Sequence, residues 1–344
     1  MESIIGGSVT LSLAVFVIAG LTIALCGVTI TVRAERLAYS TGLGQAIVGA
    51  VFLGAMTSLS GLVTSLTAAY EGHPQLAVSN AVGGIAAQTT FLALADMAYR
   101  RANLEHAAAS EANLVQGGVL IMLLAVAVLA GHTPDVTWFG LHPISVMLFG
   151  AYLLGLKLTS GAHQQPMWYP KQTHETHEEP QRQQRPPRRR LLRLWTEFLL
   201  LAVAVAVSGW VLAEASLELV ALTGLSEGLV GTLFTATTTS LPEAVIAIAA
   251  VRRGALTLAV GDIIGGNTFD VLFLSLSDLF YRQGSIYHAV THQQSFWLVL
   301  SLVMAAVLML GMLRREKYGV ANIGFESALM LLLYLGGVVV LVSS

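Results

Sequence analysis

The sequence predicts an all-α membrane protein with ten transmembrane helices, arranged as two inverted five-helix repeats with both termini outside. Three observations lead to this prediction: an apolar composition, ten long apolar segments, and a similarity between the two halves of the chain. Of the 344 residues, 55% are hydrophobic and only 11% are charged. Because soluble domains carry roughly 25% charged residues, this composition excludes an ordinary soluble protein.

Ten segments are apolar over the length of about 20 residues that a helix needs to cross a bilayer. They lie near residues 4–31, 45–70, 74–99, 113–131, 138–158, 194–215, 226–251, 255–281, 294–313 and 322–342. The first segment follows no basic region and is longer than the apolar run of a signal peptide, so we expect it to be retained as a helix. The single cysteine, Cys26, excludes an intramolecular disulfide and is interpreted as a small apolar helix residue.

One long polar segment, residues 161–192, separates a first repeat at 1–160 from a second repeat at 193–344. It is rich in Gln, Pro, Arg and His, a composition typical of a disordered linker. Two histidines, His174 and His177, are too few for a metal site, so we interpret this stretch as solvated. The arginines at 188–190 and 193 would attract anionic lipid by about 1 kcal/mol per charge, but a positive-inside topology explains them equally well.

The positions of lysine and arginine predict the orientation of the chain in the membrane. When the loops are numbered alternately from the N-terminus, the basic residues gather on one side, and of the 18 only Arg282 falls on the other. The side rich in Lys and Arg is the cytoplasmic one. The linker is therefore predicted to be cytoplasmic and both termini to lie outside.

The two halves are related in sequence. Residues 41–100 align with 223–282 without a gap, and more than a third of the 60 positions are identical. The identical positions include Thr, Ser, Gly, Asp and Arg residues, which a shared apolar composition does not explain. Because each half has five helices, the second copy enters the membrane from the opposite face. Inverted repeats with a binding site near the midplane are a transporter architecture.

Two acids, Glu243 and Asp270, lie deep inside apolar segments of the second half. An acid at that depth is costly and marks a functional site by default. Pro242 precedes Glu243, has no N–H, and clashes with the carbonyl of Thr238 four residues earlier. Carbonyls freed in this way are tolerated where they line a cavity, and there they can coordinate cations.

The next apolar segment adds further oxygen ligands. Asn267 lies three residues before Asp270, and Gly265 and Gly266 allow a close helix approach. Carboxylates, hydroxyls, an amide and free carbonyls together form an all-oxygen set, which suits hard cations such as Ca²⁺ or Na⁺. The sequence therefore predicts a cation site in which Glu243 and Asp270 are the metal ligands.

The motif Thr-Ser-Leu-Pro-Glu at 239–243, followed by Gly-Gly-Asn-Thr-Phe-Asp at 265–270, resembles the second α-repeat of the calcium/cation antiporter superfamily. This superfamily comprises the sodium/calcium exchangers and their cation/proton relatives. The resemblance covers both halves of the chain. It implies that ions bind between the second, third, seventh and eighth helices, and that the first and sixth helices slide to alternate access. It also implies cation ligands at Thr57, Ser58, Thr239, Ser240, Glu243, Gly266 and Asp270.

The first repeat departs from the family pattern. The usual Pro-Glu is Ser60-Gly61 here, Gly-Ser-Asn reads Gly83-Gly84-Ile85, and Gln88 stands where Asn or Asp is usual. We interpret Gln88 either as a replacement ligand or as a buried amide that bonds a neighbouring helix. Gly266 likewise stands where Ser is usual. Since Ca²⁺ takes 6–8 oxygens and its affinity depends on ligand charge, the lost carboxylate should weaken Ca²⁺ binding.

The predicted function is secondary active antiport of Ca²⁺ or another cation against Na⁺ or H⁺, without a resident cofactor. A monovalent cation/proton antiporter and a non-transporting descendant are the alternatives. An intramembrane protease is disfavoured because Asp262 has no second Asp partner. The expected partners are inorganic cations and membrane lipid, with no nucleic acid, and short loops indicate a prokaryotic inner membrane.

Four further polar residues are given structural interpretations. Asp96 and Asp278 precede Tyr and Arg at helix ends and are interpreted as interfacial anchors. Asn80 and its counterpart Asp262 are assigned either to a vestibule or to helix capping.

Overall fold

The computed structural model describes residues 7–41, 54–99, 103–169, 188–317, 319 and 323–343, and its regular structure within these ranges is entirely helical. This confirms the predicted all-α class. Eight helices of the described residues are long and apolar enough to cross a membrane, or nine if the bent pair 227–239 and 241–253 forms one span. The expected second span begins at residue 45, and its residues 45–53 lie outside the described ranges. Ten spans and outside termini therefore remain predictions.

The helices follow the expected order along the chain. In the first half they are α1 (Val9–Thr41), α3 (Gly54–Thr57), α4 (Leu59–Tyr70), α5 (Pro74–Ala98), α6 (Leu104–Ala108), α7 (Glu111–Ala130) and α8 (Pro143–Gln164). The second half begins with α9 (Arg188–Thr223), α10 (Glu227–Leu229), the π-helix η2 (Val230–Thr235), α11 (Ala236–Thr239) and α12 (Leu241–Arg253). It ends with α13 (Leu256–Asp270), α14 (Leu272–Phe280), α15 (Ile286–Ala289), α16 (His292–Arg314) and α17 (Phe325–Ser343).

Several helix boundaries differ from the sequence prediction. The polar segment 161–192 is helical at both described ends, because α8 continues to Gln164 and α9 begins at Arg188. Arginine and leucine are good helix formers, so α9 extends beyond its apolar stretch. The short helices α6 and α15 were not predicted, since neither is long enough to show an apolar period. Most of the linker, residues 170–187, lies outside the described ranges.

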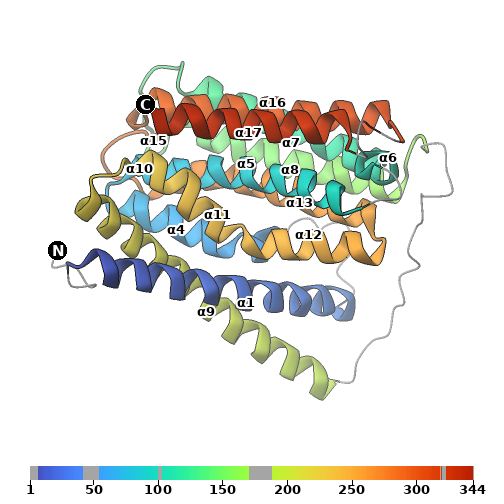
Figure 1. Ribbon diagram of the computed structural model, residues 1–344, viewed down its shortest axis with the longest axis horizontal. Helices are drawn as coiled ribbons and strands as arrows, with labels where there is room; N and C mark the ends of the chain where they lie inside the picture. Colours follow the sequence, from blue (N-terminus) through green and yellow to red (C-terminus); the bar gives the residue numbers. More distant parts are fainter. Residues whose placement is uncertain are drawn as a thin grey trace.

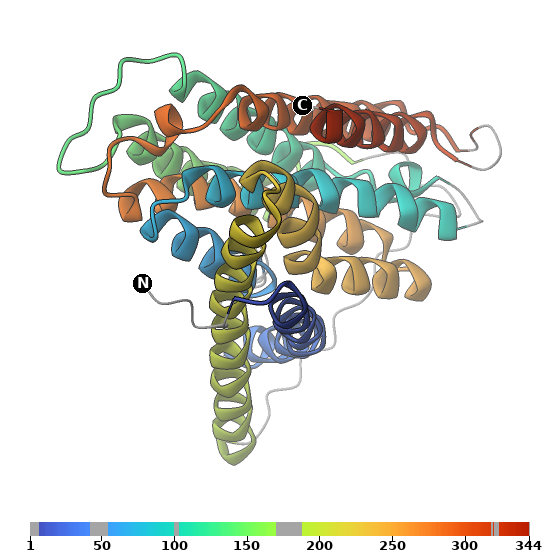
Figure 2. The ribbon, with the colours of Figure 1, turned by 60° about the vertical axis from the view of Figure 1, so that its left-hand side comes forward.

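The helices α1 and α9 form a pair at one side of the bundle. In Figures 1 and 2, α9 extends away from the other helices beside α1, while α5 and α13 run through the middle. Two apolar clusters hold this pair together, one around Ile23 and Leu212 and one around Ile30 and Val205. Both are separate from the main core, which is built on α5, α7, α13 and α16. The pair therefore has apolar packing of its own.

The pair touches the rest of the bundle at glycines related by the repeat. A Cβ on Gly27 of α1 would lie 2.5 Å from Cγ of Pro242, and a Cβ on Gly209 of α9 would lie 2.7 Å from the carbonyl oxygen of Ser60. Gly27 and Gly209 are 182 positions apart, as are Ser60 and Pro242. The inverted repeat is thus visible in the packing as well as in the sequence.

Asp96 and Asp278 correct the sequence interpretation, because both side chains are fully buried and neither is an interfacial anchor. Asp96 accepts hydrogen bonds from the backbone N–H of Leu104 at 2.6 Å and of Gly324 at 3.2 Å. Asp278 accepts the equivalent bonds from Ile286 at 2.9 Å and His142 at 2.7 Å. Each aspartate therefore joins the last helix of the other repeat to its own, and buried backbone N–H groups require such partners.

A hydrogen-bonded ion pair joins α5 to α10 at the predicted outer face. Nδ1 of His73 lies 2.7 Å from Oε1 of Glu227, while Oε2 accepts from the N–H of Leu76 at 3.1 Å. The carboxylate thus satisfies a free N–H in the first turn of α5. The hydrogen bond to Glu227 raises the pKa of His73 above its ordinary value of 6.5, and burial only partly opposes this.

Replacing Asp278 with Asn should lower the unfolding temperature in detergent. Asp278 accepts hydrogen bonds from two N–H groups and, at 2.7 Å, from the hydroxyl of Ser145. An amide NH₂ in place of one oxygen leaves at least one buried N–H unpaired, and such a loss costs about 1–3 kcal/mol. The matched control is Asp135→Asn, since that side chain is 59% exposed. Equal unfolding temperatures for the two variants would contradict the role of Asp278.

The His73–Glu227 pair should make stability depend on pH. Because the pKa of folded His73 lies above the unfolded value, the stabilisation is complete below pH 6.5 and is lost as the pH rises through the folded pKa. The difference in unfolding temperature between wild type and His73→Gln should therefore be largest at acidic pH and shrink at alkaline pH. Thermal unfolding from pH 5.5 to 9 measures it, and a constant difference would count against the pair.

Candidate cation-binding site

Two helix breaks, at Ser58 and Ser240, face each other inside the bundle. Ser58 lies between α3 and α4 with φ −88° and ψ 8°, and Ser240 lies between α11 and α12 with φ −93° and ψ 5°. In the second repeat Pro242 explains the break, because it cannot donate to the preceding turn. The axis bends there by 45°. The first repeat breaks at the equivalent residue without a proline, so neighbouring helices must hold this conformation.

The two predicted acids come together at these breaks. Glu243 lies in the first turn of α12 and Asp270 is the last residue of α13, and both are 2% exposed. The hydroxyl of Ser58 donates to Oε1 of Glu243 at 3.4 Å, while Oδ2 of Asp270 accepts from the amide of Gln88. Each carboxylate thus accepts a hydrogen bond from a residue of the first repeat.

Neither carboxylate has a positive partner among the described residues. Oε2 of Glu243 and Oδ1 of Asp270 are buried without a hydrogen-bond partner. A buried carboxylate without a positive partner, and with one oxygen lacking a hydrogen bond, is costly to keep charged. The arrangement therefore suits groups that take up a cation or a proton.

Gln88 of α5 completes the centre of the site. Its amide Nε2 donates to Oδ2 of Asp270 at 2.7 Å and to Oγ of Ser240 at 3.3 Å. Gln88 and Asp270 are equivalent residues of the two repeats, so their contact lies on the axis that relates the repeats. The amide of Gln88 thus bonds a neighbouring helix, while its Oε1 is buried without a hydrogen-bond partner, so a ligand role for Gln88 stays a prediction.

The glycine at position 266 makes room for Gln88. A Cβ on Gly266 would lie 3.1 Å from Oε1 of Gln88. A serine at 266 would therefore crowd the longer glutamine side chain. Gly266 is next to the carboxylates but offers no side-chain ligand.

The other predicted ligands lie around this centre and differ in the hydrogen bonds that their side chains make. Thr57 donates to the carbonyl of Gly54 at 3.0 Å. Asn267 donates to Thr89 at 2.9 Å and leaves its Oδ1 buried without a partner. The methyl group of Thr238 faces α1, where a Cβ on Gly20 would lie 2.6 Å from it. Of these three residues, only Asn267 has a buried side-chain oxygen without a hydrogen-bond partner.

Asn80 is a residue whose role the sequence did not indicate. It is the seventh residue of α5 and is buried, so it neither caps a helix nor lines a vestibule. Its Nδ2 donates to the carbonyl of Gly61 at 3.0 Å and to Oγ of Ser65 at 2.9 Å. Its Oδ1 accepts from Oγ1 of Thr239 at 3.3 Å. The row of Ser and Thr residues along α4 was the signal that a polar partner would face it.

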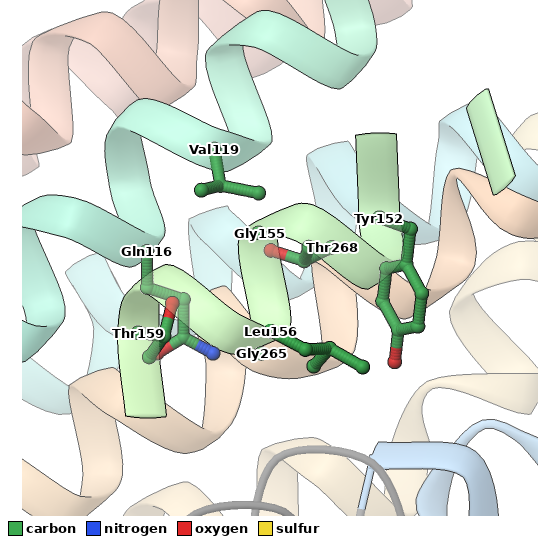
Figure 3. Close-up of a pocket in the computed structure, with 8 residues that line it drawn as sticks. All are labelled: Gln116, Val119, Tyr152, Gly155, Leu156, Thr159, Gly265 and Thr268. Carbon is green, nitrogen blue, oxygen red and sulfur yellow. The ribbon is translucent and has the colours of Figure 1, made fainter. Parts of the chain in front are cut away.

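A small pocket lies on the other side of α13, toward α7 and α8 (Figure 3). Its lining residues are Gln116, Val119, Tyr152, Gly155, Leu156, Thr159, Gly265 and Thr268. Neither carboxylate lines it, so it is separate from the cation site. The ring of Tyr152 packs edge-on against Phe269, the residue before Asp270, with centroids 6.2 Å apart.

The family comparison agrees with this geometry. The family model described as "Sodium/calcium exchanger protein" matches residues 11–159 and 194–343, which together cover most of both halves. The chain belongs to this family. Its members are secondary transporters, so the chain is a transporter of the exchanger type and not an enzyme. The predicted calcium/cation antiporter resemblance is thereby confirmed.

Two curated relatives illustrate how distant the similarity is. The chain is 26% identical over 329 residues to the putative antiporter CaxA of Alkalimonas amylolytica, which covers 90% of this chain and 92% of CaxA. It is 28% identical over 137 residues to the sodium/calcium exchanger MaX1 of Methanosarcina acetivorans. That second match spans 40% of this chain and only 39% of MaX1.

Solved exchanger structures share the fold. An H⁺/Ca²⁺ exchanger, CAX, superposes with a TM-score of 0.71 at 14% identity, covering 95% of this chain and 82% of that one. The sodium-calcium exchanger NCX_Mj superposes with a TM-score of 0.61 at 18% identity, covering 96% and 99%. Together with the apolar helices, the family confirms an integral multi-pass membrane protein. The prokaryotic relatives support the expected inner-membrane location.

Close packing of α5 on η2 should tolerate no side chain at Gly83. A Cβ there would lie 2.7 Å from both Cα and the carbonyl oxygen of Thr232, and backbone atoms cannot move aside cheaply. Gly83→Ala should therefore lower the unfolding temperature by several degrees. Gly118→Ala is the control, because nothing lies within 4 Å of its Cβ and alanine favours a helix by up to about 1 kcal/mol. Destabilisation by both variants alike would contradict the close approach.

Proposed function

We propose that the protein exchanges Ca²⁺ or another cation against Na⁺ or H⁺ at a site built on Glu243 and Asp270. The observation that carries this proposal is the pair of buried carboxylates, each with one unpaired oxygen and without a positive partner among the described residues. Family membership supports cation antiport in general. The geometry supports the site, because the carboxylates lie at helix breaks and beside the repeat axis, where transporter sites are found.

Alternating access in this proposal uses α1 and α9 as the moving pair. Their separate apolar clusters and glycine contacts support such a movement, because small residues present a smooth surface to Ser60 and Pro242, which follow the two breaks. A shift of the pair along these surfaces would uncover the two serines from one side or the other. The buried carboxylates would then meet water and exchange their cation or proton.

A monovalent cation/proton antiporter is the second candidate. The donor set of the described residues favours it in one respect, because Oδ2 of Asp270 is already occupied by the amide of Gln88. That leaves fewer charged oxygens for a cation that takes 6–8 ligands. A non-transporting descendant of the family is the third candidate, and flux measurements separate it from the other two.

Neutralising the acids should abolish transport. In proteoliposomes of purified protein, imposed gradients of Ca²⁺, Na⁺, K⁺ and H⁺ identify the exchanged ions. Glu243→Gln and Asp270→Asn should each reduce the flux at least about 100-fold, because an amide removes the charge that offsets the desolvation of the cation. Glu227→Gln is the control, since Glu227 lies at the helix end and pairs with His73. Flux that persists in both acid variants would overturn the proposed site.

A further inference from the structure

The site is asymmetric with respect to the repeat axis. Gln88 and Asp270 are equivalent residues of the two repeats, and they are in direct contact. Each other ligand of the site likewise has an equivalent residue in the other repeat, 182 positions away in the sequence. The counterpart of Glu243 is Gly61, and that of Asn267 is Ile85. All the carboxylates of the site therefore come from the second repeat.

The place of the missing carboxylate is filled by an aromatic ring. A Cβ on Gly61 would lie 3.0 Å from Cε2 of Phe273 and 3.5 Å from Oγ1 of Thr239. Phe273 is 2% exposed and packs edge-on against Phe269 with centroids 6.0 Å apart. Phe269 packs in turn against Tyr152, which appears in Figure 3. A row of three rings thus holds Phe273 against residue 61.

The polar atoms on the two sides of the axis differ in their hydrogen bonding. Around Gly61, the carbonyl oxygen accepts from Asn80, and Asn80 in turn accepts from Thr239. On the other side, Glu243, Asp270 and Asn267 each have one buried oxygen without a partner. Oε1 of Gln88, at the repeat axis, is also buried without a partner. The position around Gly61 is therefore internally paired, and the oxygens left for a cation lie at the axis and on the second-repeat side.

We propose that the site holds one cation at a time, on the second-repeat side, and that Phe273 closes the position related to it by the repeat. This inference rests on the proposed cation transport at Glu243 and Asp270. A cation beside Gly61 would lose hydration to an apolar ring that offers no ligand in exchange. Phe273 is thus a specificity-determining residue, and Gly61 provides the space for it.

Saturation of transport tests the number of cations. Initial flux into proteoliposomes at fixed pH is measured against the external concentration of Ca²⁺, Na⁺ or K⁺, each varied in turn with a fixed concentration of counter-ion inside. The transported cation should give a Hill coefficient of 1, and titration calorimetry of the detergent-purified protein should give one bound ion. A Hill coefficient near 2 or two bound ions would overturn the single-cation inference. Absence of flux, or flux unchanged in Glu243→Gln, would overturn the proposed function instead.

Reopening the second position tests the role of Phe273. The double variant Gly61→Glu/Phe273→Ala supplies a carboxylate and the room for it. It should raise the Hill coefficient toward 2 for a monovalent cation, or lower the half-saturating Ca²⁺ concentration at least about tenfold. Phe273→Ala alone, which adds no ligand, should keep a coefficient of 1.

Two outcomes would contradict this role. If the double variant unfolds cooperatively and its transport saturates as in the wild type, Phe273 does not block a second cation position. If the double variant does not fold, Gly61→Ser with Phe273→Leu provides a smaller change at the same place, and a wild-type saturation curve for it overturns the role equally.

Discussion

The cost of burying the carboxylates of Glu243 and Asp270 is the constraint on which the rest of the structure depends. A charge inside an apolar bundle must be neutralised or hydrogen-bonded, and no positive side chain of the described residues pairs with either acid. The hydroxyl of Ser58 and the amide of Gln88 each donate a hydrogen bond to one of the carboxylates. Those bonds leave one oxygen of each carboxylate unpaired. The incomplete pairing is what a site that binds and releases a cation requires.

The repeat supplies the geometry that holds these groups in place. Asp96 and Asp278 each hydrogen-bond backbone N–H groups of both repeats, so each repeat fixes a helix of the other. Gly27 and Gly209 set the contacts of α1 and α9 with the same symmetry. These contacts lie away from the repeat axis. The residues of the site, which lie at the axis, can therefore differ between the two repeats without disturbing the fold. That freedom explains how the site became asymmetric while the fold stayed symmetric.

Much of the fold and the centre of the site follow from the sequence, because they rest on long-range patterns. The length of the apolar segments predicts the membrane spans, and the ungapped alignment of the two halves identifies Ser58 and Ser240 as equivalent residues. The roles of Asn80, Asp96 and Asp278 do not follow. Their hydrogen-bond partners are far away in the sequence, such as Thr239 for Asn80 and Gly324 for Asp96. A polar residue near a helix end looks the same in sequence whether it faces water or a buried N–H.

The departures from the family pattern have a different meaning in the structure than in the sequence. In the sequence, Gly61 replaces a carboxylate of the family pattern and Gly266 replaces a hydroxyl. Taken separately, both changes suggest a site that is losing its ligands. In space they are matched to other residues: the missing side chain at 61 leaves room for Phe273, and the missing one at 266 leaves room for Gln88. Random loss would leave cavities, which are destabilising in a close-packed interior. Here Phe273 and Gln88 fill the space, and the carboxylates beside them keep unpaired oxygens. This combination indicates a cation site with fewer ligands, located on the side of Glu243 and Asp270.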